Sequence, residues 1–211
     1  MKLDRIVVVA ALAAVAGCAP VQKKDYSDFL ALKPRSILVV PTVNHTTNVD
    51  AADYFLSTLA IPVAERGYYV FPVNMVKRVL EDDGLADADL VHAAEPAKLA
   101  DLFGADAVLY VTIERWDTRY IVLKSSTTVE FSYVMKHRDG KEIWGTKQTM
   151  VYQSQGGNSL LGAIVAAAIQ KAAPNYMPLA HQANGLALGY PGNGFPAGPY
   201  RPEYQKDIQQ E

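Results

Sequence analysis

The sequence predicts one α/β domain with a mixed sheet, in which parallel βα units are followed by a long antiparallel hairpin and a C-terminal helix. Short apolar runs alternate with amphipathic stretches between residues 36 and 116, as in parallel βα units. Two stretches with period-two alternation then flank Asp139-Gly140, a strong two-residue hairpin signal. An apolar stretch of helix length, residues 160–173, follows them.

An apolar run near the N-terminus leads to the only cysteine of the chain. Ile6–Ala16 follows a short basic leader, and it is shorter than the about 20 residues of a transmembrane helix. Val15-Ala16-Gly17-Cys18 resembles a bacterial lipobox, whose cysteine thiol receives a diacylglyceryl group. We therefore expect residues 1–17 to be a lipoprotein signal peptide and Cys18 to be the lipidation site. The alternatives are a secretory signal without lipid and a buried N-terminal helix.

The residues after Cys18 predict where the domain is held. In the lipoproteins that this leader resembles, aspartate after the cysteine retains the protein at the inner membrane, so Ala19 favours the outer membrane of a two-membrane cell. Residues 18–33 are expected to form a polar tether that spans at most roughly 50 Å when extended. We expect a lipid-anchored domain that faces the periplasm, with surface exposure as the other orientation.

The first βα unit is predicted from an apolar run and a helical pattern. Ser36–Pro41 is a continuous run of β-branched type, typical of a strand buried on both faces. Asp50 is placed to cap a helix over Ala51–Arg66, which Pro62 should bend or shorten and Gly67 should end.

The next units follow the same alternation. Tyr68–Phe71 is expected to be a strand and Glu95–Phe103 a short helix closed by Gly104. Between them, a helix over Pro72–Asp82 should turn three apolar side chains inward, Val76, Val79 and Leu80. An acidic patch after this helix does not match a calcium loop and is interpreted as a solvated loop: Asp82, Asp83, Asp87 and Asp89.

The second half of the sheet should be antiparallel. Ala107–Trp116 alternates, with Leu109, Val111 and Ile113 on one face. Thr127–Lys136 and Glu142–Tyr152 also alternate on the two sides of the turn, so they predict a hairpin with one wetter face.

The helix predicted over Leu160–Ala173 is apolar on all sides, which indicates burial. Its small-residue face could pack within the domain or against another subunit, and insertion into a membrane is a third interpretation. That face is the candidate interface and consists of Gly162, Ala163, Ala166 and Ala167.

The domain is expected to span residues 34–173, and residues 174–211 form an extension rich in proline, glycine and tyrosine. This composition argues against long regular structure, whereas the tyrosines argue against a plain disordered tail. The extension is expected to wrap the domain or to dock on a partner in extended form.

No arrangement of residues predicts catalysis, a cofactor or a metal ion. The four histidines, His45, His92, His137 and His181, are too widely spaced to place a metal pair on one helix face. A single cysteine allows neither an internal disulfide nor a thiolate metal site. The net charge of −2 argues against a nucleic-acid partner.

Several stretches together resemble a family of bacterial outer-membrane lipoproteins of unknown function that includes a neisserial surface-antigen candidate. They are the lipobox, RSILVVPTVNHTTNVDAADYF, GADAVLYVTIERW, the hairpin, GGNSLLGAIVAAAI and PAGPYRPEY. The resemblance implies a fold similar to the N-terminal domain of TolB and to the periplasmic domain of the curli-export lipoprotein. It also implies other envelope lipoproteins, including the curli-export type, as partners, and it carries over no catalytic residue.

These observations favour an accessory protein of the cell envelope that acts by protein–protein contact and not as an enzyme. Its expected partners are the membrane, through lipid on Cys18, other envelope lipoproteins and a second copy of the chain. A solute-binding lipoprotein of a transport system is the alternative, and a periplasmic hydrolase with a hidden site is the third.

Overall fold

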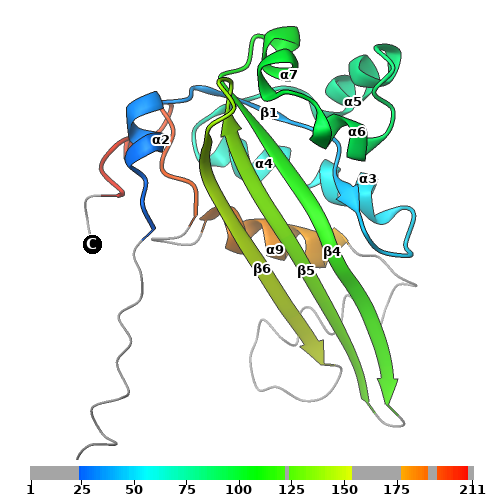
Figure 1. Cartoon of the computed structure of the whole chain (residues 1–211). Coiled ribbons are helices and arrows are strands. Elements are labelled where there is room, and N and C mark those ends of the chain that lie inside the picture. The colour runs from blue at the N-terminus through cyan, green and yellow to red at the C-terminus, as the bar shows by residue number, and fades with distance from the viewer. Residues whose placement is uncertain (1–23, 122–123, 154–176, 190–193, 209–211) are drawn as a thin grey trace, which may run out of the picture.

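A computed structural model of the chain describes residues 24–121, 124–153, 177–189 and 194–208 (Figure 1). In these residues a mixed six-stranded sheet carries helices on both faces, which confirms the predicted α/β fold class. The strand order is β3-β1-β4-β5-β6, and β2 pairs with β4. The strands are β1 (Ser36–Val39), β2 (Val43–Asn44), β3 (Tyr69–Val70), β4 (Ala107–Ile121), β5 (Lys124–His137) and β6 (Glu142–Gln153).

The parallel part of the sheet is centred on β1. This strand pairs in parallel with β3 on one side and with β4 on the other. Ile37, Leu38 and Val39 are fully buried, because helices cover both faces at this point, as the continuous apolar run predicts. The prediction missed β2, which has two residues and therefore shows no period of its own.

The structure has two short helices, α3 (Ala51–Ser57) and α4 (Ala60–Glu65), where the sequence predicted one helix over residues 51–66 that Pro62 would bend or shorten. The helical conformation is interrupted at Thr58, four residues before Pro62. Proline has no amide proton and its ring clashes with the carbonyl four residues earlier, so it disrupts a helix interior. As the third residue of α4, Pro62 lies in the first turn, where backbone nitrogens need no acceptor within the helix.

The other face of the sheet carries α5 (Val73–Asp82), α6 (Ala88–Ala93) and α7 (Pro96–Phe103). The sequence predicted α5 and α7, but it assigned α6 to a solvated loop. The inward placement of Val79 was wrong: it is 38% exposed, and Val73 packs inward together with Val76 and Leu80.

Two helix ends follow the glycine signals that the sequence predicted, and one cap was not predicted. Gly67 and Gly104 take left-handed backbone, with φ of 87° and 72°, just after α4 and α7. The Asp87 side chain accepts a hydrogen bond from the Asp89 amide at 2.8 Å and so caps α6. Asp50 precedes α3 as predicted, but its side chain makes no capping hydrogen bond.

Strands β4, β5 and β6 form a long antiparallel meander. The predicted inward faces of β4 and β5 are buried, including Ile113, Phe131, Tyr133 and Met135. The turn between β5 and β6 differs from the predicted two-residue form. The His137 amide donates to the Lys141 carbonyl at 2.8 Å, which leaves three residues in the turn, and Gly140 takes a φ of 92°.

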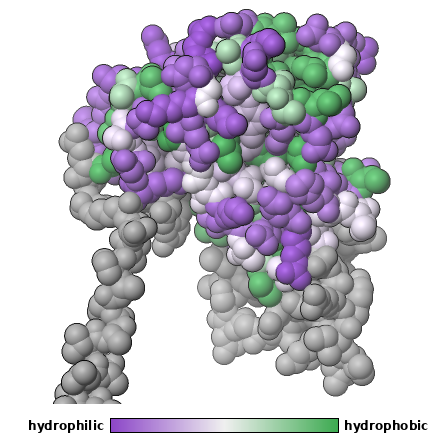
Figure 2. All heavy atoms as spheres, in the orientation of Figure 1, coloured by the Kyte–Doolittle hydropathy of each residue, from purple (hydrophilic) through white to green (hydrophobic). Residues whose placement is uncertain are grey.

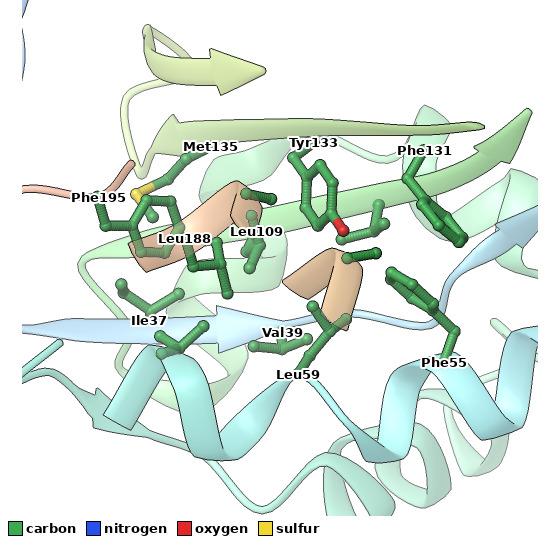
Figure 3. Packing of buried hydrophobic residues seen from close by; sticks show 14 of the residues in the cluster. Ile37, Val39, Phe55, Leu59, Leu109, Phe131, Tyr133, Met135, Leu188 and Phe195 are labelled. Carbon is green, nitrogen blue, oxygen red and sulfur yellow. The ribbon is translucent and has the colours of Figure 1, made fainter. Parts of the chain in front are cut away.

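Helix α9 (Met177–Gly189) corrects the expectation that the C-terminal extension lacks long regular structure. Its buried residues recur at helical spacing: Ala180, Ala183, Asn184, Ala187 and Leu188. Leu188 of α9 and Phe55 of α3 point toward the strand side chains Leu109 and Phe131 (Figure 3). Asn184 is also fully buried, accepts from the Tyr133 hydroxyl at 2.9 Å and donates to the Thr58 hydroxyl at 2.7 Å, so all three polar groups are satisfied.

Candidate functional site

Cys18 and the candidate interface residues Gly162, Ala163, Ala166 and Ala167 lie outside the described residues. Within the described part of the chain, no group of three or more His, Cys, Asp or Glu side chains could hold a metal ion. No described helix is both long enough and apolar enough to cross a bilayer.

One cluster of titratable side chains is buried next to α6. The His92 ring donates from Nε2 to the Pro41 carbonyl at 3.0 Å and lies edge-on to Tyr110 at 5.1 Å. Burial lowers the pKa of His92 and raises the pKa of Tyr110 to about 12, so both are neutral at pH 7. The Tyr110 hydroxyl and the Thr42 hydroxyl are buried without a hydrogen-bond partner in the described structure. Because His92 bonds a backbone carbonyl and not a nucleophile, the cluster has the features of packing and not of a catalytic pair.

A second cluster joins the two ends of the described chain. We call it the terminal junction and define it as residues 24–33, which include α2 (Ser27–Leu32), together with residues 194–208. Residues 24–33 were expected to belong to the tether, but Tyr26 and Phe29 are only 8% and 4% exposed. Residues at both ends of the described chain therefore contribute to the folded body.

The centre of the terminal junction is the carbonyl of Gly194. It accepts hydrogen bonds from the Tyr26 hydroxyl at 2.8 Å and from the Trp144 indole at 3.1 Å. The neighbouring Phe195 ring is 1% exposed and lies 4.3 Å from the Trp144 ring and 6.2 Å from the Tyr68 ring. Aromatic packing and two donors thus hold a segment that has no regular structure of its own.

Polar side chains at and after the end of α4 also bind residues 196–207 of the terminal junction. The Arg66 guanidinium lies 2.7 Å from the Asp207 carboxylate, and the same carboxylate oxygen accepts from the Ala197 amide at 2.7 Å. The Tyr68 hydroxyl donates to the Pro196 carbonyl at 2.8 Å, and burial raises the pKa of Tyr68. These contacts leave the backbone of residues 196–198 tied at several points.

Two glycines make the close approach of these segments feasible. A Cβ atom on Gly198 would lie 2.2 Å from the Gly67 carbonyl oxygen, well inside any real contact. The Gly198 amide donates to the Arg66 carbonyl at 2.7 Å, which requires this approach. A larger residue at position 198 would therefore move the segment away from α4.

Lys24, the first described residue, is attached to the sheet by its side chain. Its ammonium donates to the carbonyl of Gly145 in β6 and lies 4.4 Å above the Trp144 ring. Burial lowers the pKa of Lys24 to about 8, and the nearby Glu142 carboxylate opposes this shift. The chain is thus attached to the domain from its first described residue.

A shallow groove of about 230 Å³ runs along the terminal junction. It is mostly apolar, and its lining residues are Phe29, Leu30, Lys33, Pro34, Pro196, Ala197, Tyr204 and Gln205. This volume includes open solvent, so the space that the groove encloses is far below the about 300–1,000 Å³ of pockets that bury a small molecule. The groove therefore fits surface contact better than enclosure of a solute. One sign of this surface is visible in the sequence, namely the aromatic residues within the expected tether and extension.

Comparison with known proteins identifies relatives over most of the chain. Residues 24–189 match the family described as "Putative lipoprotein GNA1162-like". The "Putative lipoprotein NMB1124/NMB1162" of Neisseria meningitidis serogroup B is 38% identical over 201 residues, which are 90% of this chain and 93% of that protein. The crystal structure of lipoprotein GNA1162 from Neisseria meningitidis is similar at a TM-score of 0.58 and 37% identity, over 65% of this chain and 96% of that one.

Proposed function

The chain belongs to the GNA1162-like lipoprotein family, and we propose that it is a lipid-anchored accessory protein of the cell envelope that binds other envelope proteins without catalysis. The observation that carries the proposal is the place of Cys18. The only cysteine of a chain from a lipoprotein family closes an apolar leader, directly after three residues of lipobox type. Lipid on this thiol ties the body to the outer membrane, in the orientation that Ala19 favours, with the domain in the periplasm.

The described domain supports a role in binding. Two of its buried polar side chains, those of Asn184 and Tyr133, hydrogen-bond to each other inside the core. Apolar residues gather on the surface over the layer of α5, α6 and α7 (Figure 2). Met75, Leu90 and Leu102 of these helices are 65%, 55% and 47% exposed. Apolar side chains that reach solvent in this way suit contact with another protein.

The partners we propose are other envelope lipoproteins, including the curli-export type that the family resemblance suggests, and a second copy of this chain. The small-residue face of Gly162, Ala163, Ala166 and Ala167 is the proposed contact, because small side chains let helices approach closely. A solute-binding role in transport has less support, because the groove in the terminal junction is shallow and small.

Metabolic labelling tests the anchor. The full chain is expressed in a two-membrane bacterium with radioactive palmitate, beside the variants Cys18→Ser and Ala19→Asp. We expect label on the parent chain and none on Cys18→Ser. Ala19→Asp is the matched control, because it should keep the label and move to the inner-membrane fraction. A parent chain without fatty acid would refute the anchor.

In-cell crosslinking with mass spectrometry tests the partners. Ala166→Leu enlarges the proposed contact, and Ala64→Leu makes the same change at an exposed position on α4, away from the layer of α5, α6 and α7. We expect Ala166→Leu to reduce the crosslinks of the parent chain and Ala64→Leu to leave them unchanged. A monomeric protein that crosslinks to no envelope protein would refute the binding role.

A further inference from the structure

We propose that the terminal junction lies against the headgroup region of the membrane that holds the lipid, so that α3, α5 and α6 face away from it. This proposal rests on lipidation of Cys18 and adds an orientation to it. It starts from the side of the molecule on which the described chain begins. Helix α2 lies on one side of the sheet's long strands, and α3, α5 and α6 lie on the other (Figure 1). Lys24, just before α2, contacts the Gly145 carbonyl of β6.

The short stretch between Cys18 and Lys24 limits the orientations that the domain can take on the bilayer. From Cys18 to Lys24 there are six residue steps, which reach at most about 21 Å when fully extended. A domain of this size is roughly 40 Å across. A connection of half that length keeps the side that carries Lys24 near the bilayer and prevents the opposite side from touching it.

The contacts of the terminal junction keep this connection short. The Lys24 ammonium is bound to the Gly145 carbonyl, and Tyr26 and Phe29 are buried directly after it. Release of residues 24–33 would add about 35 Å of reach, which is enough for the domain to turn over. The attachment of Lys24, Tyr26 and Phe29 therefore decides whether the lipid orients the body or only retains it.

Surface chemistry agrees with this orientation. The groove of the terminal junction has an apolar floor that includes Leu30 and Pro196, with Lys33 and Tyr204 beside it. Tyrosine and lysine with apolar neighbours suit the interface between headgroups and acyl chains. The opposite side exposes the acidic patch around the α5–α6 turn, which anionic headgroups would repel: Asp82, Asp83, Asp87 and Asp89.

Two matched reporter variants test the orientation. Ala31 in α2 and Ala86 between α5 and α6 are both exposed, so Ala31→Cys and Ala86→Cys should fold equally well. Lipid occupies the thiol of Cys18, so each lipidated variant offers one free cysteine for a fluorophore. The labelled proteins are placed in vesicles of phosphatidylethanolamine and phosphatidylglycerol at three to one that carry a nitroxide on part of the headgroups.

We expect the nitroxide to quench the fluorophore at position 31 several-fold more than the fluorophore at position 86. Equal quenching, or stronger quenching at position 86, in protein that floats with the vesicles would overturn the orientation and leave the lipid anchor standing. Protein that carries no fatty acid and does not float would overturn both. The two failures are thus distinguished by flotation and by the mass of the N-terminal peptide.

Discussion

The two faces of the sheet are covered in different ways. The layer of α5, α6 and α7 packs on one face through a cluster that is mostly aliphatic, with Leu38, Leu80 and Leu99 fully or almost fully buried. The terminal junction covers the end of the other face with aromatic rings and with hydrogen bonds from side chains to backbone carbonyls. The two coverings differ in which groups form hydrogen bonds with the backbone amides and carbonyls.

Helices satisfy most of their own amides and carbonyls, so their side chains need only be apolar and of the right size. Residues 194–198 form no helix or strand, and their carbonyls depend on donors from elsewhere in the chain. Tyr26, Trp144, Tyr68 and Arg66 supply those donors. An irregular segment can thus be as firmly buried as a helix when distant side chains complete its hydrogen bonds.

The largest test of this comparison is Phe195→Ala. Loss of a fully packed aromatic ring should cost about 3–5 kcal/mol of unfolding free energy, as in the core of a regular element. Tyr200→Ala is the control, because this ring is 63% exposed and the change should stay within about 0.5 kcal/mol. Urea unfolding measures both. Equal, small losses would mean that residues 194–208 detach before the domain unfolds.

Alanine substitutions at two glycines, Gly198 in the terminal junction and Gly185 in α9, give the next largest expected effects. Gly198→Ala places a Cβ atom against the Gly67 carbonyl and should destabilise the protein by about 1–3 kcal/mol. Gly185→Ala in α9 meets nothing within 4 Å and should stabilise it by about 0.5–1 kcal/mol, because alanine favours the helix. Thermal unfolding gives both signs. A tolerated alanine at position 198 would contradict the close approach.

The ion pair of the terminal junction is expected to contribute less. Asp207→Asn weakens the bonds to Arg66 and to the Ala197 amide and should cost about 1–3 kcal/mol. Asp28→Asn removes the exposed pair with Lys141, whose side chains are about half exposed, and should cost at most about 0.5 kcal/mol. The two free energies come from denaturant midpoints. A larger effect for Asp28→Asn would reverse the ranking of the two pairs.

The smallest expected effect on stability comes from His92 in α6, on the other face of the sheet, and it depends on pH. Burial lowers the pKa of His92 below its ordinary value of 6.5, so the folded state disfavours the protonated ring. Its contribution to stability is complete above pH 6.5 and declines as the pH falls from 6.5 through the folded pKa. Asp89 lies nearby and favours the charged form, whereas Lys136 and His45 oppose it.

His92→Gln should make the stability of the protein less dependent on pH between 7.5 and 5.5, because glutamine does not titrate and can still donate to the Pro41 carbonyl. Unfolding curves at both pH values measure the difference. A parent chain and variant that lose stability in parallel over this range would refute the role of His92.

The sequence predicted α5 and α7 but not α6 between them, and it did not predict the terminal junction. A period of 3.6 residues marks α5, and a closing glycine marks the end of α7. Even there, Val79 was placed inward because hydrophobicity alone does not give the rotation of a helix against a sheet. Five of the six described strands were predictable because they alternate or run apolar, whereas the two residues of β2 are too few to show a pattern.

The terminal junction could not be predicted, because its signal is spread over the whole chain. Tyr26, Trp144 and Gly194 show no pattern within any short window, and their meeting is a property of the fold. Helix α9 was missed because prolines and glycines around it dominate the composition of the extension. The lipid anchor on Cys18 and the small-residue face that includes Gly162 stay predictions from the sequence, because both lie outside the described residues.

The Gly194 carbonyl also sets the order in which the protein can be completed. Its donor Tyr26 lies 168 positions earlier in the chain. Tyr26 and Trp144 can therefore complete their hydrogen bonds only when nearly the entire polypeptide is present, because both donate to the same carbonyl. A chain that ended before residue 194 would lack this acceptor and would leave both donors to water.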